Sequence, residues 1–156
     1  MRNIKNKILI FALSSILLGC SQSATSVFDK DPIYAQNIQY SKVIKVVDKD
    51  TVKAIFNITY LNSTNSKKYN DDKQNFLIGT YSIDNNASKY KLTMNGLKSF
   101  STKPLEETDE LSKNIAFKNH WAKYNIVNFP DSDEKVLTLT YTYDNNQTIF
   151  TTFKKE

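Results

Sequence analysis

Only a few residues of this 156-residue chain have side chains that could take part in chemistry. One is Cys20, the single cysteine, whose thiolate would be a nucleophile. Another is His120, the single histidine, which could act as an acid or base and stands beside Trp121. The remaining candidates are the carboxylates of one short acidic run, which could bind a cation or a partner: Asp131, Asp133 and Glu134.

Cys20 ends a segment with the layout of a secretory signal peptide. Three basic residues lie within the first seven positions, residues 8–18 are almost entirely apolar, and Gly19 directly precedes the cysteine. A run of eleven residues is shorter than the roughly 20 that a helix needs to cross the hydrocarbon core. We therefore expect this segment to be cleaved rather than to stay in the membrane.

The sequence Leu17-Leu18-Gly19-Cys20 resembles the lipobox of bacterial lipoproteins. The resemblance implies a diacylglyceryl thioether on Cys20, cleavage between Gly19 and Cys20, and an acyl chain on the new amino terminus. Two or more chains hold a protein firmly to a bilayer. In the same family, Ser21 in place of Asp favours the outer membrane when the cell has two. The predicted location is the bacterial cell envelope; the alternative is an ordinary secreted protein cleaved elsewhere.

Cleavage would change the charge of the chain. The full sequence carries +5, but three basic residues belong to the signal, which leaves 18 basic against 16 acidic residues, or +2. Nucleic-acid-binding proteins carry a basic patch or stripe, and none is visible here, so we predict no nucleic-acid partner. With Cys20 lipidated, no thiol remains for a disulfide or a Cys–His metal site. We expect no metal and no cofactor beyond the covalent lipid.

The sequence after the cysteine predicts a tether followed by a β domain. Residues 20–36 are small, polar and without a sustained period, as expected of a flexible tether. Residues 37–156 alternate polar and apolar positions in about seven segments joined by turns, which predicts a single antiparallel β-sandwich of immunoglobulin-like type, or else a small barrel. At most one short helix is expected, near residues 104–113, where Pro104 precedes an acidic stretch.

The last hairpin has the clearest predicted register. With a loop at residues 144–146, Leu137 lies opposite Phe153 and Tyr141 lies opposite Ile149. This hairpin and the segment before it are similar to small immunoglobulin-like lipoproteins of uncharacterised function. Trp121 to Phe129 and the following KVLTLTYTY carry the resemblance.

Two other hairpins are expected earlier in the chain. Residues 38–47 are predicted to pair with residues 51–61, and residues 76–83 with residues 89–94. A mixed strand is expected over residues 115–129, where His120 would be a surface or half-buried residue and Trp121 a core residue.

The candidate residues do not form a recognisable catalytic set. A catalytic histidine needs a nucleophile and an orienting carboxylate, and no GxSxG, HExxH or Gly-rich phosphate loop is present. The run at residues 131–134 lacks the glycine of a calcium loop and is better explained as a solvated turn. We therefore expect no enzymatic activity, and a hydrolase using His120 ranks last among the functions considered.

The sequence predicts a membrane-anchored, non-enzymatic module that binds or assembles with a protein partner. Its partners would be the membrane, through the lipid, and an unidentified protein, contacted through loops or sheet edges. The candidate interaction surface is His120, Trp121, Asp131, Asp133 and Glu134. One alternative is a surface adhesin or antigen. Another is an inhibitor of a lysozyme-type enzyme, which is disfavoured because a cationic enzyme calls for an acidic inhibitor.

Overall fold

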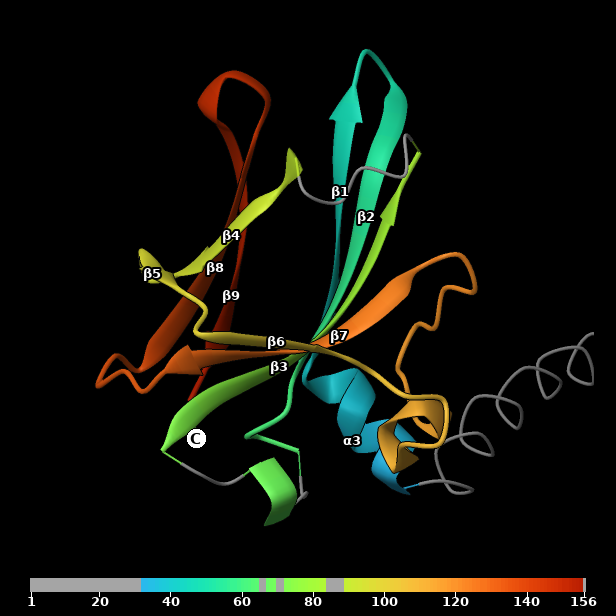
Figure 1. Ribbon diagram of the computed structural model, residues 1–156, viewed down its shortest axis with the longest axis vertical. Coiled ribbons are helices and arrows are strands. Elements are labelled where there is room, and N and C mark those ends of the chain that lie inside the picture. The colour runs from blue at the N-terminus through green and yellow to red at the C-terminus, as the bar shows by residue number, and fades with distance from the viewer. Residues whose placement is uncertain (1–31, 65–66, 70–71, 84–88, 156) are drawn as a thin grey trace, which may run out of the picture. The chain divides into compact units, whose positions relative to one another are not determined.

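The described part of the chain is an antiparallel β-sandwich with a small helical layer on one side (Figure 1). The computed structural model describes residues 32–64, 67–69, 72–83 and 89–155. The predicted signal peptide, Gly19, Cys20 and residues 20–31 of the predicted tether lie outside these ranges. Within the described residues, nine strands form two sheets.

The strands pair as antiparallel neighbours throughout both sheets. The larger sheet has five strands, in spatial order β1 (Ser41–Asp48), β2 (Thr51–Tyr60), β3 (Lys73–Ser82), β7 (Lys123–Pro130) and β6 (Ser101–Pro104). The smaller sheet has four strands, in spatial order β5 (Leu97–Lys98), β4 (Lys91–Met94), β8 (Val136–Tyr143) and β9 (Gln147–Lys154).

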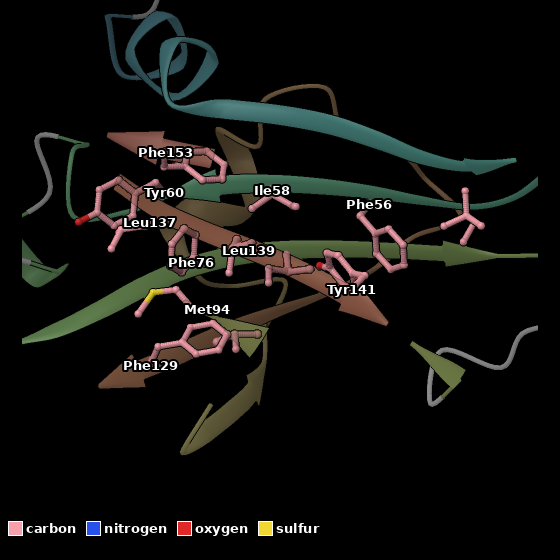
Figure 2. Packing of buried hydrophobic residues seen from close by; sticks show 14 residues of the cluster. Phe56, Ile58, Tyr60, Phe76, Met94, Phe129, Leu137, Leu139, Tyr141 and Phe153 are labelled. Carbon is pink, nitrogen blue, oxygen red and sulfur yellow. The ribbon is translucent and has the colours of Figure 1, made fainter. Parts of the chain in front are cut away.

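The main core fills the space between the two sheets (Figure 2). Phe56 of the larger sheet stacks on Tyr141 of the smaller one, with ring centroids 3.9 Å apart. Phe76 makes an edge contact with Phe153 at 5.6 Å. Alternate residues of each strand supply these side chains, which is the source of the alternation seen in the sequence. The fully buried large side chains of this core are Phe56, Ile58, Phe76, Met94, Phe129, Leu137 and Leu139.

A second cluster covers the outer face of the larger sheet. Its buried members are Leu61, Tyr69, Leu77 and Ile115. The segments around it include three short helical pieces: α3 (Pro32–Gln39), η2 (Lys67–Tyr69) and η4 (Glu110–Lys113). Because this layer covers β3, that strand is buried on both faces for most of its length.

The structure confirms the predicted all-β sandwich and excludes the barrel, because both sheets have open edges. The described residues form nine strands rather than about seven. Its connectivity is not that of an immunoglobulin domain, in which the second and third strands lie in different sheets; here β1, β2 and β3 are neighbours in one sheet. The short helix expected near residues 104–113 is the single 3₁₀ turn η4, capped by Asp109.

The first helix of the described residues begins inside the segment predicted to be the tether. Residues 32–36, assigned to the tether, belong to α3. Asn37 in that helix is buried and donates from Nδ2 to the carbonyl of Asn114 at 2.7 Å. No sustained apolar period marks this helix in the sequence, and its buried residue Asn37 is polar.

The predicted hairpins fared differently. The last one is confirmed in full: Leu137 pairs with Phe153, Tyr141 pairs with Ile149, and Asn146 in the loop has a positive φ of 63°. The first is correct in the pairing of its two strands. Its first strand begins only at Ser41, because residues 38–39 belong to α3. Its turn is the two-residue Lys49-Asp50, both with positive φ. A register shift between Val46 and Val47 restores the buried face.

Two strand predictions are wrong. β3 pairs with β2 and β7, and β4 lies in the other sheet beside β8. Because both faces of β3 are buried, alternation could not identify the face that meets the sandwich core. The strand expected over residues 115–129 is shorter, since β7 begins only at Lys123 and residues 114–122 form a loop.

Candidate functional site

The sequence-predicted surface residues lie in two separate places. His120 and Trp121 belong to the loop before β7, and the acidic residues Asp131, Asp133 and Glu134 follow its end. A strand of this length separates the two loops by about 23 Å, at roughly 3.3 Å per residue. The structure therefore does not bring the five residues together as one surface.

The loop of residues 114–122, called the aromatic loop below, is the more unusual of the two. Trp121 is 80% exposed and Phe117 is 49% exposed, and His120 is also exposed. The expectation of a surface histidine is confirmed, whereas the expectation that Trp121 packs in the core is wrong. Phe117 adopts a φ of 53°, which is costly for a bulky residue and is a recurrent feature of functional loops.

Buried polar contacts hold the aromatic loop in place. Asn57 of β2 donates from Nδ2 to the carbonyl of Ala116 at 2.9 Å and also to the carbonyl of Phe117. The Tyr124 hydroxyl accepts from the backbone N–H of Asn119 at 2.8 Å. The exposed aromatic side chains are thus carried by a backbone anchored to the sheet.

The position of the Tyr124 ring depends on Gly79, its cross-strand partner on β3. A Cβ atom at Gly79 would lie 2.3 Å from Cε1 of Tyr124, far inside van der Waals contact. Only glycine lets the ring lie against the strand and reach Asn119. Sequence reasoning missed Asn57, Gly79 and Tyr124 because none belongs to a motif.

The acidic loop after β7 has a structural role at its first residue. Asp131 accepts hydrogen bonds from Gln74 and from Lys155, whose Nζ lies at 3.3 Å. The backbone N–H of Ser132, followed by these two donors, holds the pKa of Asp131 below its usual range. Among the described residues no group of three His, Cys, Asp or Glu side chains is arranged to hold a metal ion.

A pocket of about 240 Å³ lies among α3, η2 and η4. Lys68 and Asp109 on its wall form an ion pair with Nζ and Oδ2 3.2 Å apart. The backbone N–H of Leu111 and this ammonium lower the pKa of Asp109. The walls offer amide, hydroxyl and carboxylate groups to a small polar molecule, and the lining residues include no cysteine or histidine for nucleophilic or acid–base chemistry.

A second pocket of about 240 Å³ lies between the sheets and is lined by Phe56, Tyr90 and Tyr141 together with hydroxyl and amide side chains. The Tyr141 hydroxyl is buried and has no hydrogen-bond partner among the described residues, and burial strongly raises its pKa. The lining residues include no cysteine, histidine or carboxylate that could supply nucleophilic or acid–base chemistry.

Tyr141→Phe should therefore stabilise the protein by about 1–2 kcal/mol, because it removes a hydroxyl that loses its hydration on folding and forms no hydrogen bond to replace it. Tyr60→Phe is the matched control: the Tyr60 hydroxyl donates to Oε1 of Gln74 at 2.6 Å, so its loss should destabilise. Urea unfolding of both variants measures the two free energies. A Tyr141→Phe variant less stable than wild type would contradict the interpretation of Tyr141 as unsatisfied.

The remaining feature is the free edge of the smaller sheet at β9. The backbone N–H and C=O of Thr138 in β8 both bond to Asn95, on the side of the strand away from β9. The odd-numbered residues of β8 therefore point their backbone groups at β9. The even-numbered residues of β9 consequently turn their N–H and C=O groups outward. Lys42 of β1 donates to the outward carbonyl of Thr152, and no described strand pairs with this edge at Thr148 and Phe150.

Comparison with known proteins adds no homologue. No protein-family model matches the chain, and no curated protein or solved structure gives a significant match. Within the described residues, no helix has the length and apolar character needed to cross a bilayer.

Proposed function

We propose that this protein is a lipid-anchored lipoprotein of the bacterial cell envelope whose β domain binds an extended segment of a protein partner along β9. The anchor is supported by the basic start, the short apolar run and the Gly19-Cys20 pair. The binding mode is strand addition, in which main-chain hydrogen bonds supply affinity and side chains supply selectivity.

The observation that carries the binding proposal is the contrast between β9 and the other sheet edges. β6 is short and ends at Pro104, and β5 has only two residues. β1 carries charged Lys42 and Lys45 and a register shift. These are the usual protections against unwanted pairing. β9 has eight residues in unbroken register with β8 and no charge before Lys154.

The side chains at this edge suit a protein partner. Phe150 is 65% exposed on the outer face of the smaller sheet, and Thr148 beside it is also exposed. Aromatic residues are enriched where proteins meet and dominate binding energies when they become buried. An added strand would satisfy the outward backbone groups of both residues and cover the Phe150 ring.

Thr148→Pro should weaken this binding about tenfold while leaving the fold intact. The proline removes an outward N–H that no described strand uses, and edge positions of this kind accept proline. Gln147, which would precede it, already has φ −62° and ψ 145°, the conformation that a residue before proline prefers. With a photoreactive phenylalanine analogue at position 150, cross-linking to an envelope protein in cells should fall about tenfold, the equivalent of one main-chain hydrogen bond.

Two controls make the result specific. Thr148→Ala keeps the N–H and should cross-link as wild type does. The same analogue at Phe100, which is 55% exposed and lies between β5 and β6, should give no matching product. Equal cross-linking from positions 150 and 100, or cross-linking unchanged by Thr148→Pro, would contradict strand addition at β9.

A further inference from the structure

The aromatic loop lies on the side of the domain from which the chain leads back to the proposed anchor. The hydrogen bond from Asn37 to the carbonyl of Asn114 joins α3 to the first residue of the loop, and Figure 1 shows α3 beside the yellow-orange segment that carries η4. Residues 32 and 37 are about 7.5 Å apart along a helix. The loop is thus on the order of 20 Å from the point where the chain enters the domain.

The segment between that point and the lipid limits how far the domain can lie from the bilayer. Residues 20–31 span at most about 40 Å when fully extended, at 3.3–3.6 Å per residue. The entry side of the domain, which includes the aromatic loop, is therefore held within reach of the lipid surface in the anchored protein.

The chemistry of the loop suits the interfacial zone of a bilayer. A tryptophan has an apolar ring system and one N–H donor, and such side chains concentrate at the level of the lipid headgroups. Trp121 and Phe117 project from a backbone that Asn57 and Tyr124 already hold in place, so little further ordering is needed for them to insert.

The charges around the loop indicate insertion of apolar groups rather than attraction to anionic lipid. Exposed lysines near the loop are matched by exposed glutamates of the preceding segment, and the set comprises Lys113, Lys118, Lys123, Glu106, Glu107 and Glu110. These opposite charges balance. A contact of this kind should depend little on salt, unlike binding through a polybasic patch.

From these observations we infer that Trp121 and Phe117 insert into the interface of the bilayer that holds the lipid anchor, and so form a second membrane contact. The inference rests on the proposed lipidation of Cys20. Two aromatic side chains alone bind a membrane weakly, but a short tether raises their effective concentration at the surface to the millimolar range. The contact is therefore a property of the anchored protein and orients its domain.

Trp121 is the single tryptophan of the chain and reports its own environment. The lipidated protein is reconstituted into vesicles of phosphatidylethanolamine and phosphatidylglycerol, with or without brominated acyl chains, and its fluorescence is measured. We expect quenching by brominated lipid and protection from aqueous iodide. Phe117→Gly, which keeps the positive φ without strain, should lower the ratio of inserted to free loop by about tenfold or more.

The controls separate this inference from the anchoring proposal. Flotation of the vesicles shows whether the protein is anchored, independently of fluorescence. Protein produced without residues 1–19, and therefore without the lipid, should show no bromolipid quenching when it is mixed with the same vesicles. Anchored protein whose Trp121 remains as open to iodide as in solution would overturn the inference. If Trp121 were protected from iodide only in native membranes and not in pure lipid vesicles, the inference would be overturned as well, because the loop would then contact a protein rather than lipid.

Discussion

Cys20→Ser should abolish acyl labelling of the protein and remove it from the lipid-anchored fraction. The serine hydroxyl is nearly isosteric with the thiol but is not ionised near neutral pH, so it cannot serve as the nucleophile that accepts diacylglycerol. Each buried methylene contributes about 0.8 kcal/mol to membrane binding. Loss of two or three acyl chains would therefore remove an effectively permanent lipid attachment, which is the largest effect expected of any single substitution in this chain.

Metabolic labelling with a fatty acid, followed by fractionation, measures this directly. Ser21→Ala is the matched control, because it changes the adjacent residue and keeps the thiol, and it should label as wild type does. Labelling is the decisive readout, since an uncleaved signal segment could retain some protein at the membrane without lipid. Labelling of the Cys20→Ser protein at the wild-type level would refute lipidation at Cys20.

Much of the sandwich could be predicted because its information is local. In the β8–β9 hairpin, alternation and loop length together fix the register, and Asn146 supplies the left-handed residue that the loop requires. The same reasoning failed for β3. There Phe76 faces the main core and Leu77 the second cluster, and a strand buried on both faces carries no alternation that could identify its inner face.

The candidate surfaces were less predictable because contacts distant in sequence create them. The exposure of Trp121 follows from Asn57, which is 59 residues away from Ala116 along the chain and holds the loop outside the sheet. An aromatic residue in a strand-like segment is ordinarily buried, and composition gives no sign of such an anchor. The free edge of β9 likewise depends on the strand order of the whole sheet, which hairpin patterns do not specify.

Asn57 joins the larger sheet to the aromatic loop. Its replacement by aspartate should lower the free energy of unfolding by a large amount that depends on pH. Asn57 is buried, at 4% exposure, and its Nδ2 faces the carbonyl oxygens of Ala116 and Phe117. A carboxylate oxygen in place of Nδ2 would face these two acceptors, and the hydroxyl of Tyr124 would lie 3.5 Å away, at the limit of a hydrogen bond. Leaving a buried charge uncompensated costs about 3–5 kcal/mol, a large part of the 5–15 kcal/mol that typically stabilises a domain.

The sign of the pH dependence follows from the protonated form of the introduced carboxyl group. In its neutral form this group can still donate one O–H to a carbonyl, so burial and the two carbonyl dipoles raise its pKa above the ordinary value of about 3.9. Stability is then retained below the unfolded pKa and lost as the pH rises through the folded pKa. We expect urea unfolding to show the Asn57→Asp protein close to Asn57→Ala at about pH 4 and clearly less stable at about pH 8.

Asn57→Ala separates the loss of the anchor from the burial of a charge. It removes the same two hydrogen bonds but carries no titratable group, so its destabilisation relative to wild type should be constant across this range. In both variants Trp121 should become more mobile, which fluorescence anisotropy of this single tryptophan detects. If the stability of Asn57→Asp, relative to Asn57→Ala, does not fall with rising pH, the loop must detach and let water hydrate the carboxylate. Asn57 would then position the loop without being enclosed by it.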